Sequence, residues 1–194
     1  MSLLDISPVV PVVVIDDADA AVPLAQALLR GGIGIIEVTL RTPAALGAIE
    51  RIAAEVPETV VGAGTVTTPE LAAEAAKAGA RFLVTPGATD RVLDAVADTG
   101  LPSLPGAATV SEAMRLAERG FTELKFFPAE AAGGAPYLKS IAGPLPGLRF
   151  CPTGGITAAT APKYLALPNV GCVGGSWLTS GDVETLAKEA AALR

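Results

Sequence analysis

The sequence predicts an α/β fold in which eight strand-helix units close into a (β/α)8 TIM barrel. Three observations support this prediction. Short apolar runs alternate with alanine-rich helical stretches, eight such units can be counted, and threonine or glycine residues mark many of their junctions. The 194 residues allow about 24 per unit, slightly below the usual size of this fold. An open, doubly wound parallel sheet is the alternative.

Each expected strand is a short run of apolar and β-branched residues between turn residues. In chain order the strands are expected at residues 9–15, 33–39, 59–65, 82–85, 102–105, 123–127, 149–153 and 170–174. Each of the first seven is followed by a helical candidate, and the last by a helix at the end of the chain. No linker or polar low-complexity stretch interrupts the alternation, so residues 1–194 are expected to form a single domain.

The helices are predicted from capping signals at both ends. Thr68 stands before Pro69, and Thr109 before a second apolar-periodic segment, so each hydroxyl can cap a helix N-terminus. Asp16 and Asp17 are expected to begin the first helix, where negative charge is favourable. Residues that can adopt the left-handed conformation are expected after four helices, at Gly31, Gly79, Gly100 and Gly120.

Composition argues against several classes of function. The net charge of −6 and the pI near 4.7 argue against nucleic-acid binding, because phosphate backbones are bound by clustered Lys and Arg. No apolar run approaches the roughly 18 residues of a membrane span, and no signal peptide is recognisable. A cytoplasmic protein without a membrane partner is therefore expected. The chain has no histidine, and its two cysteines lack CxxC spacing, which argues against a zinc site.

Alternation along the strands places the polar residues on one face of the sheet. Glu37 and Thr39 share one face of the second strand, and Glu123, Lys125 and Phe127 share one face of the sixth. These more polar faces are expected to point into the barrel, while the purely apolar faces pack under the helices. Catalytic groups of such barrels gather at the carboxyl ends of the strands.

Lys125 is the residue with the clearest chemical signal. It lies within an apolar run, residues 123–128, that otherwise has the composition of a buried strand. A buried amine loses hydration, which favours its neutral, nucleophilic form. Schiff-base catalysis needs such a lysine. The other four lysines lie in helical stretches where solvated faces are expected: Lys77, Lys139, Lys163 and Lys188.

Five polar residues from four strands are expected to converge at the barrel mouth. Lys125 would attack a substrate ketone, Glu37 would move protons, and Arg41 would pair with a carboxylate. Thr65 and Thr153 would hydrogen-bond the substrate. A purely structural interpretation exists for each group taken singly. The lysine and glutamate could form a buried ion pair, the arginine could be solvated, and the first threonine could cap a turn.

Two glycine-rich turns follow the seventh and eighth expected strands: Thr153-Gly-Gly-Ile156 and Gly174-Gly-Ser-Trp177. Glycines expose backbone N–H groups, so such turns can bind a phosphate without any lysine or arginine. Barrels often bind phosphate at these two turns. A single glycine pair would be better explained by a tight turn, but two successive pairs favour phosphate binding.

Six motifs in order resemble those of the 2-keto-3-deoxy-6-phosphogluconate (KDPG) aldolase family, which are class I aldolases. They are Glu37-Val-Thr-Leu-Arg-Thr42, Val61-Gly-Ala-Gly-Thr65, Pro86-Gly87, Lys125-Phe-Phe-Pro-Ala-Glu130, Phe150-Cys-Pro-Thr-Gly-Gly-Ile156 and Gly174-Gly-Ser-Trp177. The resemblance implies a TIM barrel, usually a homotrimer, that needs no cofactor or metal. The implied lyase reaction is reversible cleavage of KDPG to pyruvate and glyceraldehyde 3-phosphate, a step of the Entner-Doudoroff pathway. The family often also cleaves 4-hydroxy-2-oxoglutarate (KHG), to pyruvate and glyoxylate.

The resemblance also implies roles for individual residues. Lys125 matches the Schiff-base lysine and Glu37 the proton acceptor and donor. Arg41, Thr65 and Lys125 match the pyruvate contacts, and Pro86 matches a proline near the substrate. The phosphate end is matched by Gly154, Gly155, Gly175 and Ser176.

Two departures from the family pattern bear on structure and selectivity. The segment before Pro8 is shorter than in many members, so less of the chain is expected to be available to close the bottom of the barrel. Asp16 and Asp17 stand where some members have basic residues. If those basic residues help to bind the phosphate, this chain is expected to be less selective for a phosphorylated substrate. The alternative function is a phosphate-binding TIM-barrel isomerase or ligand-binding protein without lyase activity. It would use the same glycine turns but would need no interior amine.

Overall fold

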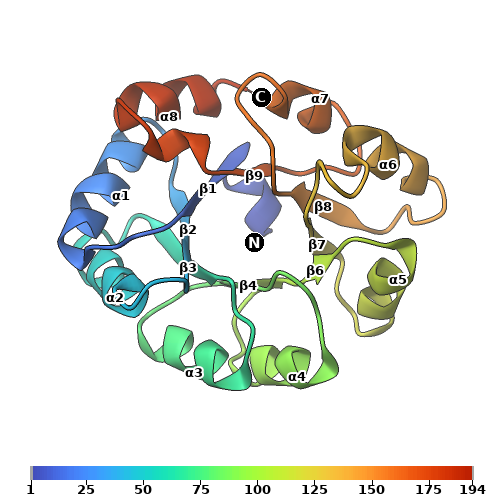
Figure 1. Ribbon diagram of the computed structural model, residues 1–194, viewed down its shortest axis with the longest axis horizontal. Coiled ribbons are helices and arrows are strands. Elements are labelled where there is room, and N and C mark those ends of the chain that lie inside the picture. The colour runs from blue at the N-terminus through green and yellow to red at the C-terminus, as the bar shows by residue number, and fades with distance from the viewer. Residues whose placement is uncertain (1, 194) are drawn as a thin grey trace.

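The computed structural model describes residues 2–193, in which a ring of parallel strands is surrounded by helices (Figure 1). The strands are β1 (Val9–Val13), β2 (Ile35–Thr39), β3 (Val60–Gly64), β4 (Leu83–Val84), β5 (Ser103–Leu104), β6 (Gly106–Ala107), β7 (Glu123–Phe126), β8 (Arg149–Pro152) and β9 (Val173–Gly175). The α-helices are α1 (Ala21–Arg30), α2 (Ala45–Glu55), α3 (Pro69–Lys77), α4 (Asp90–Asp98), α5 (Val110–Glu118), α6 (Gly134–Ile141), α7 (Ala161–Leu165) and α8 (Val183–Ala191). Three 3-10 turns complete the chain: η1 (Leu3–Asp5), η2 (Ala18–Ala20) and η3 (Trp177–Thr179).

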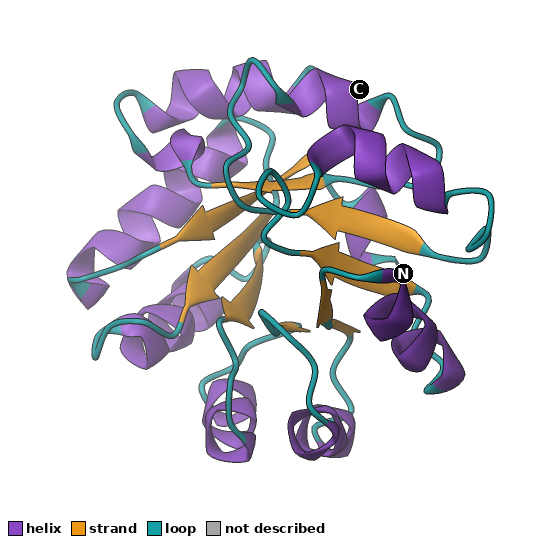
Figure 2. Cartoon of the chain, turned by 45° about the vertical axis from the view of Figure 1, so that its right-hand side comes forward, coloured by secondary structure: helices purple, strands orange, loops and turns teal. Residues whose placement is uncertain are grey.

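The strands form a closed barrel, which confirms the predicted fold. One sheet has the order β5-β4-β3-β2-β1-β9 and the other β6-β7-β8, with parallel pairing throughout. Two isolated parallel bridges, Phe150 to Val170 and Thr153 to Gly174, join β8 to the segment of β9. The open, doubly wound alternative is therefore wrong for this chain. Figure 2 shows the strands on the inside and the helices on the outside.

The expected fifth strand, residues 102–105, is divided into two short strands at Pro105. Proline has no N–H to donate, so it interrupts a ladder. Before it, β5 pairs with β4, and after it, β6 pairs with β7. The two pieces therefore occupy one position in the ring and connect the two sheets. The expected eighth strand, 170–174, is also displaced, because regular pairing begins only at Val173.

The helix caps agree with the sequence except at the two ends of α1. The Thr68 hydroxyl accepts a hydrogen bond from Leu71 N, and Thr109 forms a capping box with Glu112. Gly79, Gly100 and Gly120 are left-handed, as predicted. Gly31 is not left-handed, and this prediction is wrong.

At the end of α1 the left-handed residue is Gly32, with φ +91°, whereas Gly31 has φ −77°. A Cβ at Gly31 would lie 2.3 Å from Ala187 Cβ and 2.8 Å from Glu184 O. Position 31 therefore has no room for a side chain, because α8 packs directly against it. Near the other end of α1, Asp17 caps η2, which leads into the helix, rather than α1 itself.

The short N-terminal segment closes the bottom of the barrel. In Figure 1 it lies at the centre of the ring. Leu4 in η1 is fully buried, and a Cβ at Gly171 would come within 2.5 Å of Leu4 Cβ. Arg149 forms two hydrogen bonds with Asp5, of 2.6 and 3.2 Å, and Ser2 bonds to Glu123. Residues 2–5 thus cover the bottom of the barrel.

No helix within residues 2–193 is long and apolar enough to cross a bilayer.

We predict that Leu4→Ala lowers the free energy of unfolding by about 2–5 kcal/mol, because it opens a cavity in a fully packed site. Urea denaturation of the purified protein measures this change. Met114→Ala is the matched control, since Met114 is 48% exposed and its truncation should change stability by about 0.5 kcal/mol or less. Equal effects of the two substitutions would show that the N-terminal turn does not seal the barrel.

Candidate active site

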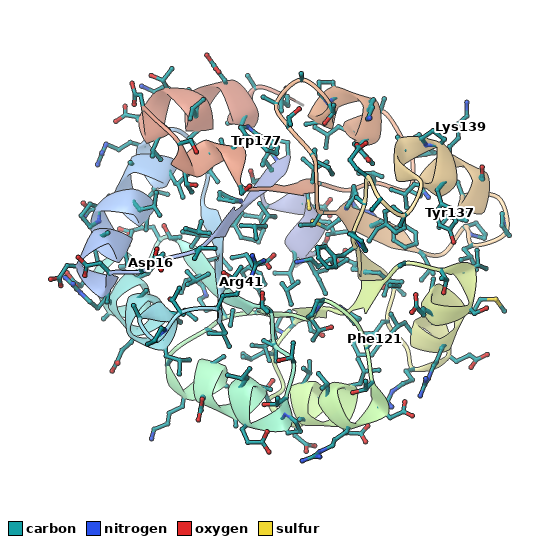
Figure 3. All side chains as sticks on the ribbon, viewed as in Figure 1. Asp16, Arg41, Phe121, Tyr137, Lys139 and Trp177 are labelled. Carbon is teal, nitrogen blue, oxygen red and sulfur yellow. The ribbon has the colours of Figure 1, made fainter. Side chains whose placement is uncertain are left out.

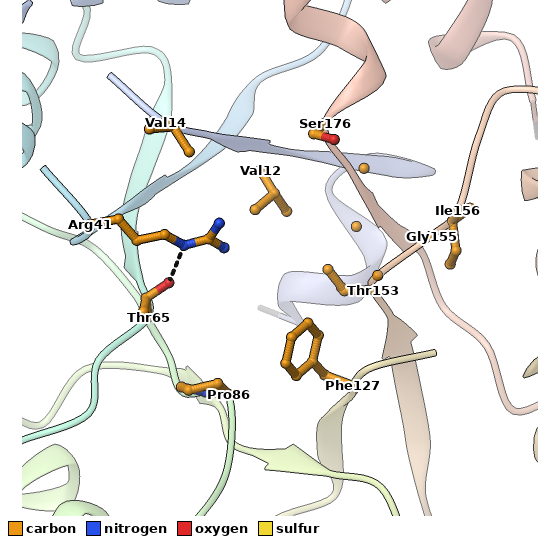
Figure 4. Close-up of a pocket in the computed structure, with 13 residues that line it drawn as sticks. Val12, Val14, Arg41, Thr65, Pro86, Phe127, Thr153, Gly155, Ile156 and Ser176 are labelled. Carbon is orange, nitrogen blue, oxygen red and sulfur yellow. Dashed lines mark hydrogen bonds between the residues drawn. The ribbon is translucent and has the colours of Figure 1, made fainter. Parts of the chain in front are cut away.

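A pocket of about 400 Å³ opens at the carboxyl ends of the strands (Figure 4). Its lining residues are Val12, Val14, Arg41, Thr65, Pro86, Phe127, Thr153, Gly154, Gly155, Ile156, Gly174, Gly175 and Ser176. Eight of the ten residues predicted from the sequence are among them. The other two, Lys125 and Glu37, do not line the pocket and lie in the barrel interior.

Lys125 and Glu37 meet inside the barrel. The Nζ of Lys125 donates to Oε1 of Glu37 at 3.1 Å, and their side chains are 6% and 4% exposed. The two strands that carry them, β7 and β2, lie on opposite sides of the ring. The predicted inward orientation of both residues is therefore confirmed. The other four lysines are exposed on helices, also as predicted.

Glycines of β3 provide the space for this pair. A Cβ at Gly64 would lie 2.1 Å from Oε1 of Glu37. A Cβ at Gly62 would lie 2.3 Å from the ring of Phe82. Real Cβ atoms do not approach so closely, so a larger residue at position 64 would displace the carboxylate. Glycine is therefore required at position 64 to leave room for Glu37 and at position 62 to leave room for Phe82.

Phe127 connects the buried amine with the pocket. Its ring lines the pocket, and its centroid lies 5.5 Å from Nζ of Lys125. A cation within about 6 Å of an aromatic face is attracted to it. The sequence placed Phe127 on the same face as Lys125, yet it was not predicted as a site residue. That shared face was the signal that could have identified it.

Arg41 and Thr65 form the polar side of the pocket. Arg41 Nε donates to Thr65 Oγ1 at 3.2 Å, which is the dashed line in Figure 4. Figure 3 shows Arg41 directed toward the centre of the ring, whereas Lys139 points outward. Thr65 has φ +59°, an uncommon and strained conformation for a β-branched residue. Among the described residues that line the pocket, Arg41 carries the one charged side chain.

The two glycine turns form the opposite side of the pocket. Gly154 and Gly155 have φ +106° and +79°, which only glycine adopts without strain. A Cβ at Gly174 would lie 2.2 Å from Thr153 Oγ1, and one at Gly175 would lie 1.7 Å from the Trp177 ring. These turns therefore bring backbone to the edge of the pocket, beside the side chains of Thr153, Ile156 and Ser176.

Four further lining residues were not predicted from the sequence: Val12, Val14, Ile156 and Gly174. Position at the carboxyl end of a strand was their shared signal, but apolar residues are common there. Within residues 2–193, no group of three or more His, Cys, Asp or Glu side chains is arranged to bind a metal ion.

The closed barrel and its buried amine define a class of protein, the (β/α)8-barrel enzymes with a lysine in the barrel interior. Within that class, the family model described as KDPG and KHG aldolase matches residues 1–191. The chain therefore belongs to the KDPG and KHG aldolase family.

Similar proteins have names consistent with this family. The KHG/KDPG aldolase of Escherichia coli (strain K12) is 52% identical, covering 93% of this chain and 85% of its own. A crystal structure of the Zymomonas mobilis ZM4 aldolase with 3-phosphoglycerate has a TM-score of 0.94 at 46% identity, covering 98% of this chain and 94% of that one. The Legionella pneumophila KDPG aldolase, with pyruvate captured as a covalent carbinolamine, has a TM-score of 0.95 at 44% identity, covering 97% and 96%. Family membership disfavours the isomerase and non-enzymatic alternatives.

We predict that Lys125→Met lowers the free energy of unfolding by about 3–5 kcal/mol at neutral pH, because it leaves the Glu37 carboxylate buried without a counter-charge. The double variant Lys125→Met/Glu37→Leu removes both charges and should regain wild-type stability or exceed it. Urea denaturation of both variants measures this. If the double variant is less stable than the single one, the pair stabilises the fold, and the view that its burial costs stability and serves function is wrong.

Proposed function

We propose that this chain is a class I aldolase that reversibly cleaves KDPG to pyruvate and glyceraldehyde 3-phosphate. The observation that carries the proposal is the amine of Lys125, buried in the barrel 3.1 Å from the Glu37 carboxylate. A keto acid in the pocket would lie beside this pair, next to Phe127. No cofactor or metal has a role in the proposed reaction.

Lys125 is proposed to form the covalent intermediate. Its neutral amine adds to the C2 ketone, so that an Nζ–C2 bond forms and the C2 oxygen becomes a hydroxyl. Loss of this hydroxyl as water gives a cationic imine, which can accept the electrons of the C3–C4 bond. The carbinolamine captured in the Legionella pneumophila aldolase is the corresponding adduct of pyruvate, the product keto acid, and supports this covalent route.

Glu37 is proposed to move the protons. It lies within hydrogen-bond distance of the amine, so it can take part in carbinolamine formation and dehydration. It then removes the C4 hydroxyl proton as the C3–C4 bond breaks, which releases the aldehyde and leaves an enamine. Protonation at C3 and hydrolysis of the imine free pyruvate and regenerate the amine.

The polar side of the pocket is proposed to bind the pyruvate end. Arg41 uses Nε on Thr65, which leaves its two terminal nitrogens for the substrate carboxylate. Thr65 and Thr153 can hydrogen-bond the substrate, and Pro86 limits the pocket beside them. The strained backbone of Thr65 keeps its hydroxyl directed at the arginine.

The glycine turns are proposed to bind the phosphate. Gly154, Gly155, Gly175 and Ser176 line one side of the pocket, where backbone N–H groups can be donors. The Zymomonas mobilis structure with 3-phosphoglycerate supports a phosphorylated ligand in this fold.

KHG is a second proposed substrate. The name of the Escherichia coli relative includes both activities, and both substrates have the same 2-keto acid end. That end would make the same contacts with Lys125, Glu37 and Arg41 in both substrates. The phosphate side of the pocket would contribute only to cleavage of KDPG.

We further infer a cytoplasmic homotrimer in which residues 1–194 fold as one domain. The 51% content of hydrophobic residues in a small barrel supports association. We predict a solution mass three times the 19.4 kDa of the chain. Size-exclusion chromatography with light scattering measures it, and a monomeric mass would contradict the trimer without affecting the proposed chemistry.

We predict that borohydride added with pyruvate traps a covalent adduct on Lys125. Mass spectrometry of peptides locates the adduct, and Lys125→Met should abolish it together with cleavage activity. Lys139→Met is the matched control, because Lys139 is exposed on α6 and directed outward. An adduct on another lysine would overturn the assignment of Lys125.

We predict that Glu37→Gln lowers kcat for KDPG by about 10² to 10⁴, the usual contribution of general acid-base catalysis. A coupled assay with lactate dehydrogenase follows pyruvate release through NADH consumption. The thermal unfolding midpoint is measured in parallel to establish that the variant is folded. Wild-type turnover by this variant would exclude the proposed role of Glu37.

A further inference from the structure

A side-chain cluster outside the pocket lies directly against its glycine turn. The Tyr164 hydroxyl on α7 donates to Glu130 Oε1 at 2.5 Å, and Lys163 Nζ lies 3.1 Å from the same oxygen. Tyr164 is fully buried, whereas Glu130 and Lys163 are partly exposed. Neither Glu130 nor Tyr164 lines the pocket, and the reaction proposed above uses neither.

The backbone joins this cluster to the turn. Ala129 N donates to Thr153 O at 2.8 Å, and Glu130 N donates to Gly154 O at 3.1 Å. The loop between β7 and α6 is therefore bonded along the turn that follows β8. The backbone around Glu130 cannot shift without moving Gly154.

The side chain of Glu130 also packs under the turn. A Cβ at Gly155 would lie 3.0 Å from both Cβ and Cγ of Glu130. The stem of this glutamate thus contacts left-handed Gly155, while its carboxylate is bonded to Tyr164. The side chain connects a glycine turn, which has no side chain of its own to anchor it, to a fully buried ring on α7.

The protonation states favour this contact. The hydrogen bond from Tyr164 and then the Lys163 ammonium hold the pKa of Glu130 below its usual range. Burial, together with the neighbouring carboxylate, raises the pKa of Tyr164. The glutamate is therefore an anion and the tyrosine a proton donor at neutral pH, which is the strong form of such a bond.

We propose that Glu130 and Tyr164 are positioning residues that hold the Gly154–Gly155 turn in its phosphate-binding shape, and so set the affinity for phosphorylated substrates. This inference rests on the proposed function and adds to it a determinant of specificity. The pair acts through the turn and not on the reacting atoms. Its removal should therefore weaken binding of a phosphorylated substrate and leave the Schiff-base chemistry intact.

The test compares KDPG with KHG, which lacks the phosphate. Tyr164→Phe keeps the buried ring and removes only the hydroxyl. We expect it to raise KM for KDPG about 5- to 20-fold. Losing a hydrogen bond to a charged group weakens the support of the turn, and only part of that free energy should appear as lost substrate affinity. KM for KHG, kcat for both substrates, and borohydride trapping of pyruvate should stay within about two-fold of wild type by the same argument.

Three further variants separate positioning from general damage. Glu130→Ala should raise KM for KDPG at least as much as Tyr164→Phe, whereas Glu130→Gln, whose amide oxygen can still accept from Tyr164, should restore most of the affinity. Lys139→Met is the control outside the cluster and should resemble wild type, because Lys139 is exposed on α6 and directed outward. Thermal unfolding establishes that each variant is folded.

If Tyr164→Phe and Glu130→Ala raise KM equally for both substrates, or for neither, the inference is overturned. Cleavage of KDPG by the wild-type protein would still uphold the proposed function. A wild-type protein that cleaves neither substrate and traps no pyruvate would overturn both. The two failures are therefore distinguishable.

Discussion

The buried contact between Lys125 and Glu37 is the centre around which the proposed active site is arranged. Nζ and Oε1 lie 3.1 Å apart although β7 and β2 stand on opposite sides of the ring. This is possible only because the barrel is closed and because Gly64 leaves room for the carboxylate. Removing two charges from water is costly, and a hydrophobic pair would often be at least as stable. The chemistry of the amine, rather than stability, therefore accounts for the pair.

The barrel mouth adds what the pair lacks, which is contact with a substrate. Phe127 borders both the amine and the pocket, so a keto acid bound there would lie beside Lys125. Arg41 and the glycine turns border opposite sides of this pocket. The two ends of the proposed substrate are thereby given different partners, a cation for the carboxylate and backbone for the phosphate. The support of the Gly154–Gly155 turn by Glu130 lies one layer further out.

Sequence patterns predicted this arrangement where a local rule has a direct spatial meaning. Period-two alternation placed Lys125 and Glu37 inside the barrel, since alternate side chains of a strand point to opposite faces. The patterns failed where the cause is a distant contact. Gly31 resembled a helix C-cap, but it is small because α8 packs against it, and Gly32 takes the left-handed conformation. The alternation also put Phe127 on the inward face with Lys125, but the contact of its ring with both the amine and the pocket depends on the tertiary structure.

The sequence alone was enough to predict the alternation of strands and helices, the inward faces of the second and sixth strands and the motifs of an aldolase family, because these depend on residues close together in the chain. The tertiary structure was needed to exclude the open sheet, to place the N-terminal turn at the bottom of the barrel and to bring Tyr164 into a hydrogen bond with Glu130 beneath a glycine turn. These features join residues far apart in the chain. Their formation depends on packing in three dimensions, which no local pattern contains.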